Sequence, residues 1–228
     1  MLILIVVVFM VASWVASSRL KRKFRKYSEV QLGSGLSGAE IAQLMLRDNG
    51  IMDVQVTSVD GHLTDHYNPA NKTVNLSRDV YHGRSAAAAA VAAHECGHAI
   101  QHATAYSMLQ FRSAMVPIQN ISGTIMNAII MISLFGGMFM MGLGYQSVLV
   151  ILIACQTVIT LFSLVTLPVE YDASNRALAW IKDRNIVNAN EHDMAKDALN
   201  AAASTYLIAA LAAVTTLLYY ILSFLGND

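Results

Sequence analysis

The chain has 228 residues, of which 55% are hydrophobic and only 13% are charged. Soluble domains usually carry about one quarter charged residues, so this composition indicates a protein that faces lipid. The 15 basic and 15 acidic residues balance, which argues against nucleic acid as a partner. The two cysteines, Cys96 and Cys155, are too few for a disulfide scaffold and are expected to be reduced thiols.

Four apolar stretches are long enough to cross a lipid bilayer, which takes about 20 residues. We expect a first span at 1–16, a hairpin of two spans within 117–169 (117–141 and 146–169) and a last span at 203–225. Positive charges follow the first apolar stretch instead of preceding it. This order favours a retained anchor over a cleaved signal peptide.

The positive charges predict the orientation in the membrane. All fifteen Lys and Arg residues lie in two segments, eleven in 17–116 and four in 170–202. With four spans and the N-terminus outside, both segments lie on the same side of the membrane. The positive-inside rule assigns that side to the cytoplasm. The basic cluster at 19–26 is then a topology anchor, with specific binding of an anionic lipid as the narrower alternative.

Two helices are predicted in the first polar segment, one amphipathic and one rich in small residues. Ser37 and Glu40 form a capping box at the start of a helix expected over 38–49. Ser85 is a suitable N-cap for a second helix over 86–105, which opens with a run of alanines. The small side chains of this second helix would let other helices approach closely.

Short strands are predicted between these helices. Residues 53–59 alternate weakly between apolar and polar side chains, and Asp60-Gly61 is a tight-turn pair. This pattern predicts a β-hairpin into 63–67. Another short strand is expected over 73–76 after a turn.

The second helix carries the sequence His94-Glu95-Cys96-Gly97-His98, an H-E-x-x-H motif. In a helix, His94 and His98 lie on one face one turn apart, so both imidazoles can bind one Zn²⁺. Glu95 is then placed to act as the general base towards a water molecule that the metal activates. Two surface histidines flanking a glutamate are the alternative. The motif lies among small apolar residues, however, where unpaired polar groups are costly.

A catalytic zinc needs a third protein ligand and an open fourth position. Glu170 is the preferred candidate because it follows Pro168 at the cytoplasmic end of the third span and is expected to open a helix over 170–182. An ionisable residue at that depth suggests a functional site. A favourable interaction between a carboxylate and a helix N-terminus is the simpler alternative.

Other polar residues are weaker candidates for the third ligand. His102 lies on the same face as His94, but one straight helix cannot wrap three ligands around an ion, so His102 is expected to support the site or to face solvent. Asp172 is a second-choice ligand that is expected to point off the face of Glu170. Glu191 and His192 lie in a polar stretch that is typical of a solvated loop and helix start.

Three residues near Glu170 are candidates for supporting roles. Ser174 lies one turn after Glu170 and could hydrogen-bond a ligand imidazole. Arg176 could stabilise the oxyanion of the tetrahedral intermediate or simply form a salt bridge, and Tyr171 is a further oxyanion candidate.

These motifs resemble the YugP-like neutral zinc metallopeptidases, which are membrane proteins of bacteria. The resemblance rests on LTDHYNP at 63–69, GRS at 83–85, VAAHECGHAIQH at 91–102 and LPVEYDASNRA at 167–177. The layout is also similar to HtpX-type and CAAX-prenyl-type membrane proteases, in which an apolar hairpin separates H-E-x-x-H from a glutamate ligand.

The resemblance implies that His94, His98 and Glu170 bind one zinc ion and that Glu95 is the general base. It also implies that a strand near 64–67 could pair with an extended substrate, through main-chain hydrogen bonds. Asp65 and His66 are then candidates for the wall of the substrate cleft, with ordinary turn chemistry as the alternative.

We therefore expect a mainly helical membrane protein with four transmembrane helices. The segments 17–116 and 170–202 would form a small cytoplasmic α+β zincin-like domain. The expected function is a zinc-dependent endopeptidase that cleaves polypeptide or membrane-protein substrates at the cytoplasmic face of the bacterial inner membrane, with membrane-protein quality control as a hypothesis for its role. The alternative is a non-hydrolytic zinc-binding scaffold or regulator, which would need the two histidines and Glu170 but not Glu95.

Overall fold

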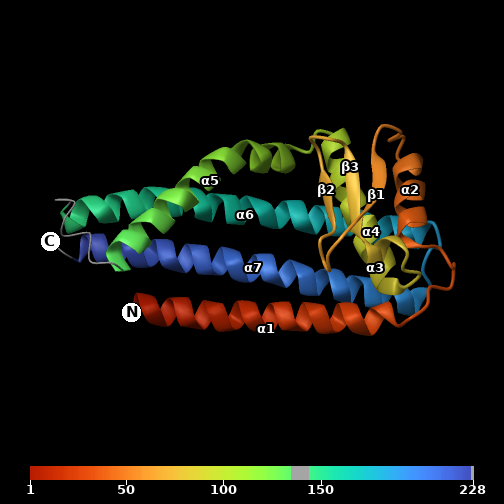
Figure 1. Cartoon of the computed structure of the whole chain (residues 1–228), viewed down its shortest axis with the longest axis horizontal. Helices are drawn as coiled ribbons and strands as arrows, with labels where there is room; N and C mark the ends of the chain where they lie inside the picture. Colours follow the sequence, from red (N-terminus) through yellow and green to blue (C-terminus); the bar gives the residue numbers. More distant parts are fainter. Residues whose placement is uncertain (135–143, 227–228) are drawn as a thin grey trace. The chain divides into compact units, whose positions relative to one another are not determined.

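The computed structural model describes residues 1–134 and 144–226 and is mainly helical (Figure 1). Within these residues, four helices are long and apolar enough to cross a membrane, as predicted. They are α1 (Leu2–Ser28), α5 (Ser107–Leu134), α6 (Tyr145–Asp183) and α7 (Ala189–Leu225). The end of the predicted second span, 135–141, lies outside the described residues.

One predicted helix boundary is wrong. The helix expected to begin at Glu170 is the C-terminal part of α6, which runs without interruption through Pro168. A proline removes one helical hydrogen bond and biases the preceding residue away from the helical conformation. In this chain the surrounding packing overrides that local preference.

The chain divides into two compact units. The first unit comprises Met1–Trp14, Phe111–Leu167 and Tyr206–Asp228. The second comprises Val15–Gln110 and Pro168–Thr205. The four long helices α1, α5, α6 and α7 therefore contribute residues to both units, whereas the sheet and the H-E-x-x-H helix belong to the second unit alone.

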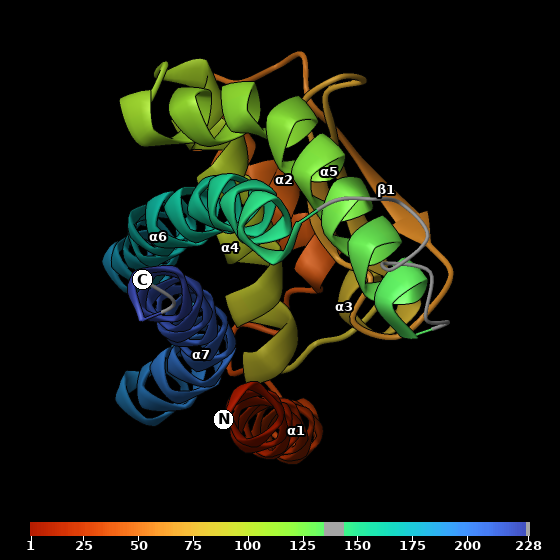
Figure 2. The same cartoon turned by 90° about the vertical axis from the view of Figure 1, so that its left-hand side faces the viewer.

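In the first unit, α6 and α7 lie side by side in both views (Figures 1 and 2). The side chains of Gln156 and Thr160 in α6 donate hydrogen bonds to the carbonyl oxygen of Ala213 in α7, at 3.0 and 3.1 Å. Such bonds satisfy polar groups that are buried between membrane helices. The buried apolar cluster of this unit contains Met126, Leu149, Cys155 and Tyr220.

A three-stranded sheet in the second unit contains β1 (Gln55–Val59), β2 (His66–Asn68) and β3 (Thr73–Ser77), in the order β1-β3-β2. β3 is parallel to β1 and antiparallel to β2. The predicted hairpin is therefore wrong, because its two strands lie on opposite sides of β3. Val74 and Leu76 of β3 are fully buried, which is typical of a central strand between more polar edges.

The helices of the second unit are capped as the sequence predicts. In α2 (Gly38–Asp48), the main-chain N–H of Ser37 donates to Glu40 Oε2 at 2.7 Å, and the N–H of Glu40 donates to Ser37 Oγ at 3.3 Å. The hydroxyl of Ser85 accepts from the N–H of Ala88 at the start of α4 (Ala86–Ala103). The short α3 (Arg78–Tyr81) follows β3 directly. The alanine-rich α4 packs against α2, α3 and the sheet.

Candidate active site

The H-E-x-x-H helix α4 crosses α6 at very short range. Gly97 lies between the two histidines of the motif, and a Cβ atom at this position would be only 2.6 Å from the carbonyl oxygen of Ala173. Ala173 is itself fully buried. A glycine is required at this crossing because any side chain would force the helices apart. The close approach brings Glu170, one turn before Ala173, to the histidines of α4.

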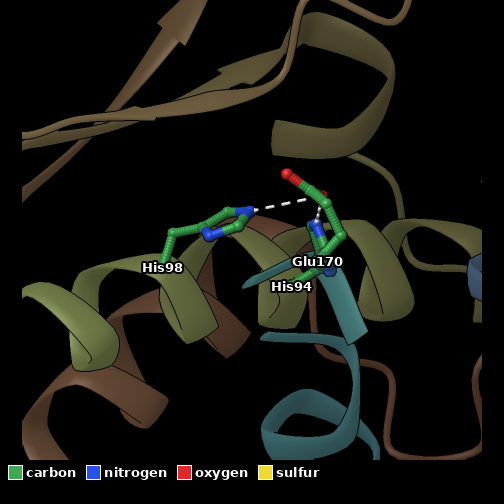
Figure 3. Close-up of side chains that lie close together, drawn as sticks. All are labelled: His94, His98 and Glu170. Atoms are coloured by element: carbon green, nitrogen blue, oxygen red, sulfur yellow. Dashed lines mark ion pairs between the residues drawn. The ribbon is translucent and has the colours of Figure 1, made fainter. Parts of the chain in front are cut away.

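His94, His98 and Glu170 point towards one another at this crossing (Figure 3). Oε2 of Glu170 is 3.4 Å from Nε2 of His94 and 3.7 Å from Nε2 of His98. One ligand atom from each residue lies within 4.8 Å of the other two. Tetrahedral zinc with bonds of about 2.0–2.1 Å places its ligand atoms roughly 3.4 Å apart. The cluster therefore fits one zinc ion without large movement of the helices.

The charge around the cluster also suits a cation. Burial alone would lower the pKa of His98, but its hydrogen bond to Glu170 and the charges of Glu95 and Glu170 raise that pKa above its ordinary value. A positive charge is therefore stabilised among these side chains.

The thiol within the motif is not part of the cluster. Cys96 is fully buried on another face of α4, and its Sγ donates to the carbonyl oxygen of Ala42 at 3.5 Å. Burial raises the pKa of this thiol strongly, so it stays protonated at neutral pH. Cys96 and Cys155 are both free, as predicted.

Glu95 is held by the edge of the sheet. Its side chain is 8% exposed, and Oε2 accepts a hydrogen bond from the main-chain N–H of Tyr67 at 2.9 Å. Tyr67 lies in β2, which pairs on its other side with β3. Residue types alone give no signal for this contact, because its donor is a main-chain group and its geometry depends on the sheet.

Each histidine of the motif has a partner on its other ring nitrogen. Nδ1 of His94 lies 3.1 Å from the hydroxyl of Ser174, the contact that the sequence suggested. Nδ1 of His98 lies 3.0 Å from Oε1 of Gln101. Gln101 was not among the predicted site residues, although it lies three residues after His98 on the same helix face.

The other candidates near the third ligand make different contacts. Nδ1 of His102 lies 2.8 Å from the hydroxyl of Tyr67, and His102 is exposed. Asp172 contacts α4 by accepting from Nε2 of Gln101 at 2.8 Å, so the expectation that it points away from the face of Glu170 is wrong.

Arg176 donates from Nε to Asp172 at 2.6 Å. The side chain of Tyr171 is exposed.

The candidates for the cleft wall lie at the start of β2. Asp65 accepts hydrogen bonds from the main-chain N–H and the hydroxyl of Ser77, at 2.7 and 3.0 Å. His66 is exposed, and its Nδ1 lies 2.8 Å from the carbonyl oxygen of Thr64.

Glu191, a weaker candidate for the third ligand, lies at the start of α7. It is buried, and its carboxylate accepts from the main-chain N–H groups of Gly33 and Asn188, both at 2.7 Å. These contacts form a helix cap. His192 is not among the three residues whose ligand atoms converge in the described part of the chain.

Four apolar helices and a His–His–Glu cluster define a multi-pass membrane protein with a candidate zinc site. The family model described as "Putative neutral zinc metallopeptidase" matches residues 2–225. The "Putative membrane protease YugP" of Bacillus subtilis (strain 168) is 40% identical over 217 residues, which cover 95% of this chain and 93% of that protein. No solved structure matches the chain. The chain belongs to the neutral zinc metallopeptidase family, as its motifs suggested.

Proposed function

We propose that the chain is a zinc-dependent endopeptidase of the gluzincin type, with His94, His98 and Glu170 as the zinc ligands and Glu95 as the general base. The observation that carries this proposal is the convergence of the three ligand atoms within 4.8 Å. These residues come from helices that are separated by an apolar hairpin in the sequence, so their meeting is a property of the fold. The simpler alternative for Glu170, a contact with a helix N-terminus, does not apply, because α6 begins at Tyr145.

A zinc ion bound here would lower the pKa of a water molecule towards 7 and polarise a substrate carbonyl. Glu95 would take a proton from the attacking water and later give it to the leaving amine. The hydrogen bond from Tyr67 occupies Oε2 of Glu95, which leaves Oε1 to carry the proton. A fixed donor on one oxygen therefore orients the carboxylate for this transfer.

The edge strand β2 offers a place for an extended substrate. In the described part of the sheet, β2 pairs only with β3. The outward N–H of Tyr67 is already bonded to Glu95, and Pro69, two residues on, has no N–H. The outward carbonyl oxygens of the strand would then accept hydrogen bonds from the N–H groups of the substrate. Such pairing recognises the main chain of the substrate and gives little selectivity for its side chains. Asp65 and His66 would lie beside the paired strand.

The distribution of positive charge supports a cytoplasmic site. All Lys and Arg residues lie in 17–116 and 170–202, the two segments that supply the candidate site. With the N-terminus outside, the positive-inside rule puts both segments in the cytoplasm of a bacterium. These segments would form the zincin-like domain, and the hairpin 117–169 would join them through the membrane. Polypeptides at the inner face of that membrane are the corresponding substrates. A role in membrane-protein quality control would fit this position.

A non-hydrolytic zinc scaffold is the competing function. It would need the three ligand residues but no oriented carboxylate beside them. The hydrogen bond between Tyr67 and Glu95 therefore favours the peptidase.

The Glu95→Gln variant separates the two functions. Purified in detergent, this variant should keep the zinc content of the wild type and lose digestion of casein and of unfolded membrane proteins. Full digestion by the variant would exclude Glu95 as the base. The wild type without any peptidase activity, but with bound zinc, would favour the scaffold.

A further inference from the structure

Gln101 joins the two halves of the candidate metal site. It is fully buried between α4 and α6. Its Oε1 lies 3.0 Å from Nδ1 of His98, and its Nε2 donates to the carbonyl oxygen of Val169 and to Oδ2 of Asp172, both at 2.8 Å. Val169 and Asp172 lie immediately before and two residues after Glu170.

We propose that Gln101 is a positioning residue that fixes the ring of His98 for metal binding and holds the segment around Glu170 against α4. This inference rests on the proposed zinc site. It assigns to Gln101 a role through His98 and Glu170, without contact to the metal or the substrate.

The hydrogen bonds of Gln101 determine which nitrogen of His98 carries the proton. A carbonyl and a carboxylate can only accept, so the contacts to Val169 and Asp172 use both N–H groups of the amide. The amide oxygen must therefore face His98. Because that oxygen can only accept, Nδ1 of His98 must be the donor. Nε2, which faces Glu170, is then the ring nitrogen that can bind a metal.

The partner of His94 lacks this property. Nδ1 of His94 faces the hydroxyl of Ser174 at 3.1 Å. A hydroxyl can donate or accept, so it does not determine whether Nδ1 of His94 carries the proton. Gln101 is therefore expected to influence the metal site more strongly than Ser174.

The second effect of Gln101 concerns the backbone of α6. Pro168 lies inside this helix and lacks the N–H that would bond one turn back, which weakens the helix locally. The next residue, Val169, receives the bond from Gln101. The link therefore holds the residue directly before Glu170, next to the proline. All three bonds are buried or partly buried, so they gain strength from the low local dielectric.

The experiment compares two variants of Gln101 with a neighbouring control in the full-length protein. Gln101→Met keeps the volume of the side chain and removes all three hydrogen bonds. Gln101→Glu keeps the shape and removes both N–H donors. Ile100→Val is the control, because Ile100 is also buried in α4 and its truncation weakens packing without removing a side-chain hydrogen bond.

Three quantities are measured in detergent: the zinc dissociation constant by competition with a chelator, the visible absorption of the Co²⁺-loaded protein, and the unfolding temperature without metal. Gln101→Met should bind zinc roughly 10- to 100-fold more weakly, and both Gln101 variants should show a changed Co²⁺ spectrum. Ile100→Val should lower the unfolding temperature and leave both metal readouts close to the wild type.

The outcomes separate this proposal from the proposed function. Folded Gln101 variants with the zinc affinity and Co²⁺ spectrum of the wild type would overturn the role of Gln101 and leave the zinc site intact. An equal loss of affinity in Ile100→Val would also overturn it, because the effect would then come from packing. A wild type that binds no zinc would overturn the proposed function itself.

Discussion

The main-chain N–H of Tyr67 donates a hydrogen bond to the carboxylate of Glu95 at 2.9 Å. This contact links the edge of the sheet to the H-E-x-x-H helix and fixes one oxygen of the proposed base. A hydrogen bond to a charged group contributes about 1.5–3 kcal/mol. Its loss should therefore affect catalysis measurably.

Tyr67→Pro removes this donor, and Tyr67→Ala serves as the matched control because it removes the same side chain and keeps the N–H. The N–H of Tyr67 points away from β3, so a proline is compatible with this edge strand. The proline variant should have a kcat/KM roughly 10- to 100-fold below that of the alanine variant, as expected for the loss of a charged hydrogen bond. Zinc content should be equal. Equal kcat/KM in the two variants would show that the contact does not support catalysis.

Gly97→Ala tests the close crossing of α4 and α6. The new Cβ would lie 2.6 Å from the carbonyl oxygen of Ala173, so the helices must separate. Overpacking of this kind costs about 1–3 kcal/mol, and we expect a lower unfolding temperature together with weaker zinc binding. Gly123→Ala in α5 is the control, because a Cβ there meets no atom within 4 Å. Unchanged zinc affinity in Gly97→Ala would contradict the account of the crossing.

Two buried glutamates allow ligation to be separated from helix capping. Glu170→Gln keeps the shape of the side chain and should weaken zinc binding at least roughly tenfold, because even the loss of a residue that only supports a ligand has an effect of this size. Glu191→Gln alters the cap of α7, and should cost about 1 kcal/mol of stability with zinc affinity unchanged. The zinc affinities of both variants are measured by titrating the purified proteins with zinc. A stronger loss of zinc in Glu191→Gln than in Glu170→Gln would reverse the assignment.

Asp65 gives a prediction for the dependence of stability on pH. Burial raises the pKa of this carboxyl group above its usual range, although hydrogen bonds from Ser77 oppose the shift. As the pH rises above about 4, the unfolded chain releases this proton first, so the contribution of Asp65 to stability decreases until the pH passes its folded-state pKa.

Asp65→Asn removes this titration and keeps an acceptor for Ser77. The difference in unfolding temperature, variant minus wild type, should therefore increase as the pH rises from 4 towards neutrality. Parallel curves over that range would show that Asp65 ionises normally in the folded protein.

The sequence was informative wherever a local pattern decides the structure. The spacing of His94 and His98 predicted a shared helix face, and the depth of Glu170 after an apolar span singled it out among several acidic residues. Ser174 followed from its position one turn after Glu170. The caps at Ser37 and Ser85 also depend only on neighbouring residues, and the structure has both.

Contacts that depend on tertiary pairing could not be predicted in this way. Asp60-Gly61 indicated a hairpin, but burial of Val74 and Leu76 makes β3 the central strand and separates β1 from β2. The bond between Tyr67 and Glu95 depends on that topology. Gln101 lies close to His98 in the sequence, but its link to α6 could not be predicted, because those partners lie about 70 residues further along the chain.

X-ray absorption at the zinc edge of the purified wild type tests the central claim most directly. Coordination by His94, His98 and Glu170 predicts two imidazole nitrogens and at least one oxygen at about 2.0–2.2 Å, with no sulfur. A sulfur ligand at about 2.3 Å, a single imidazole, or folded protein that takes up no zinc would contradict the account.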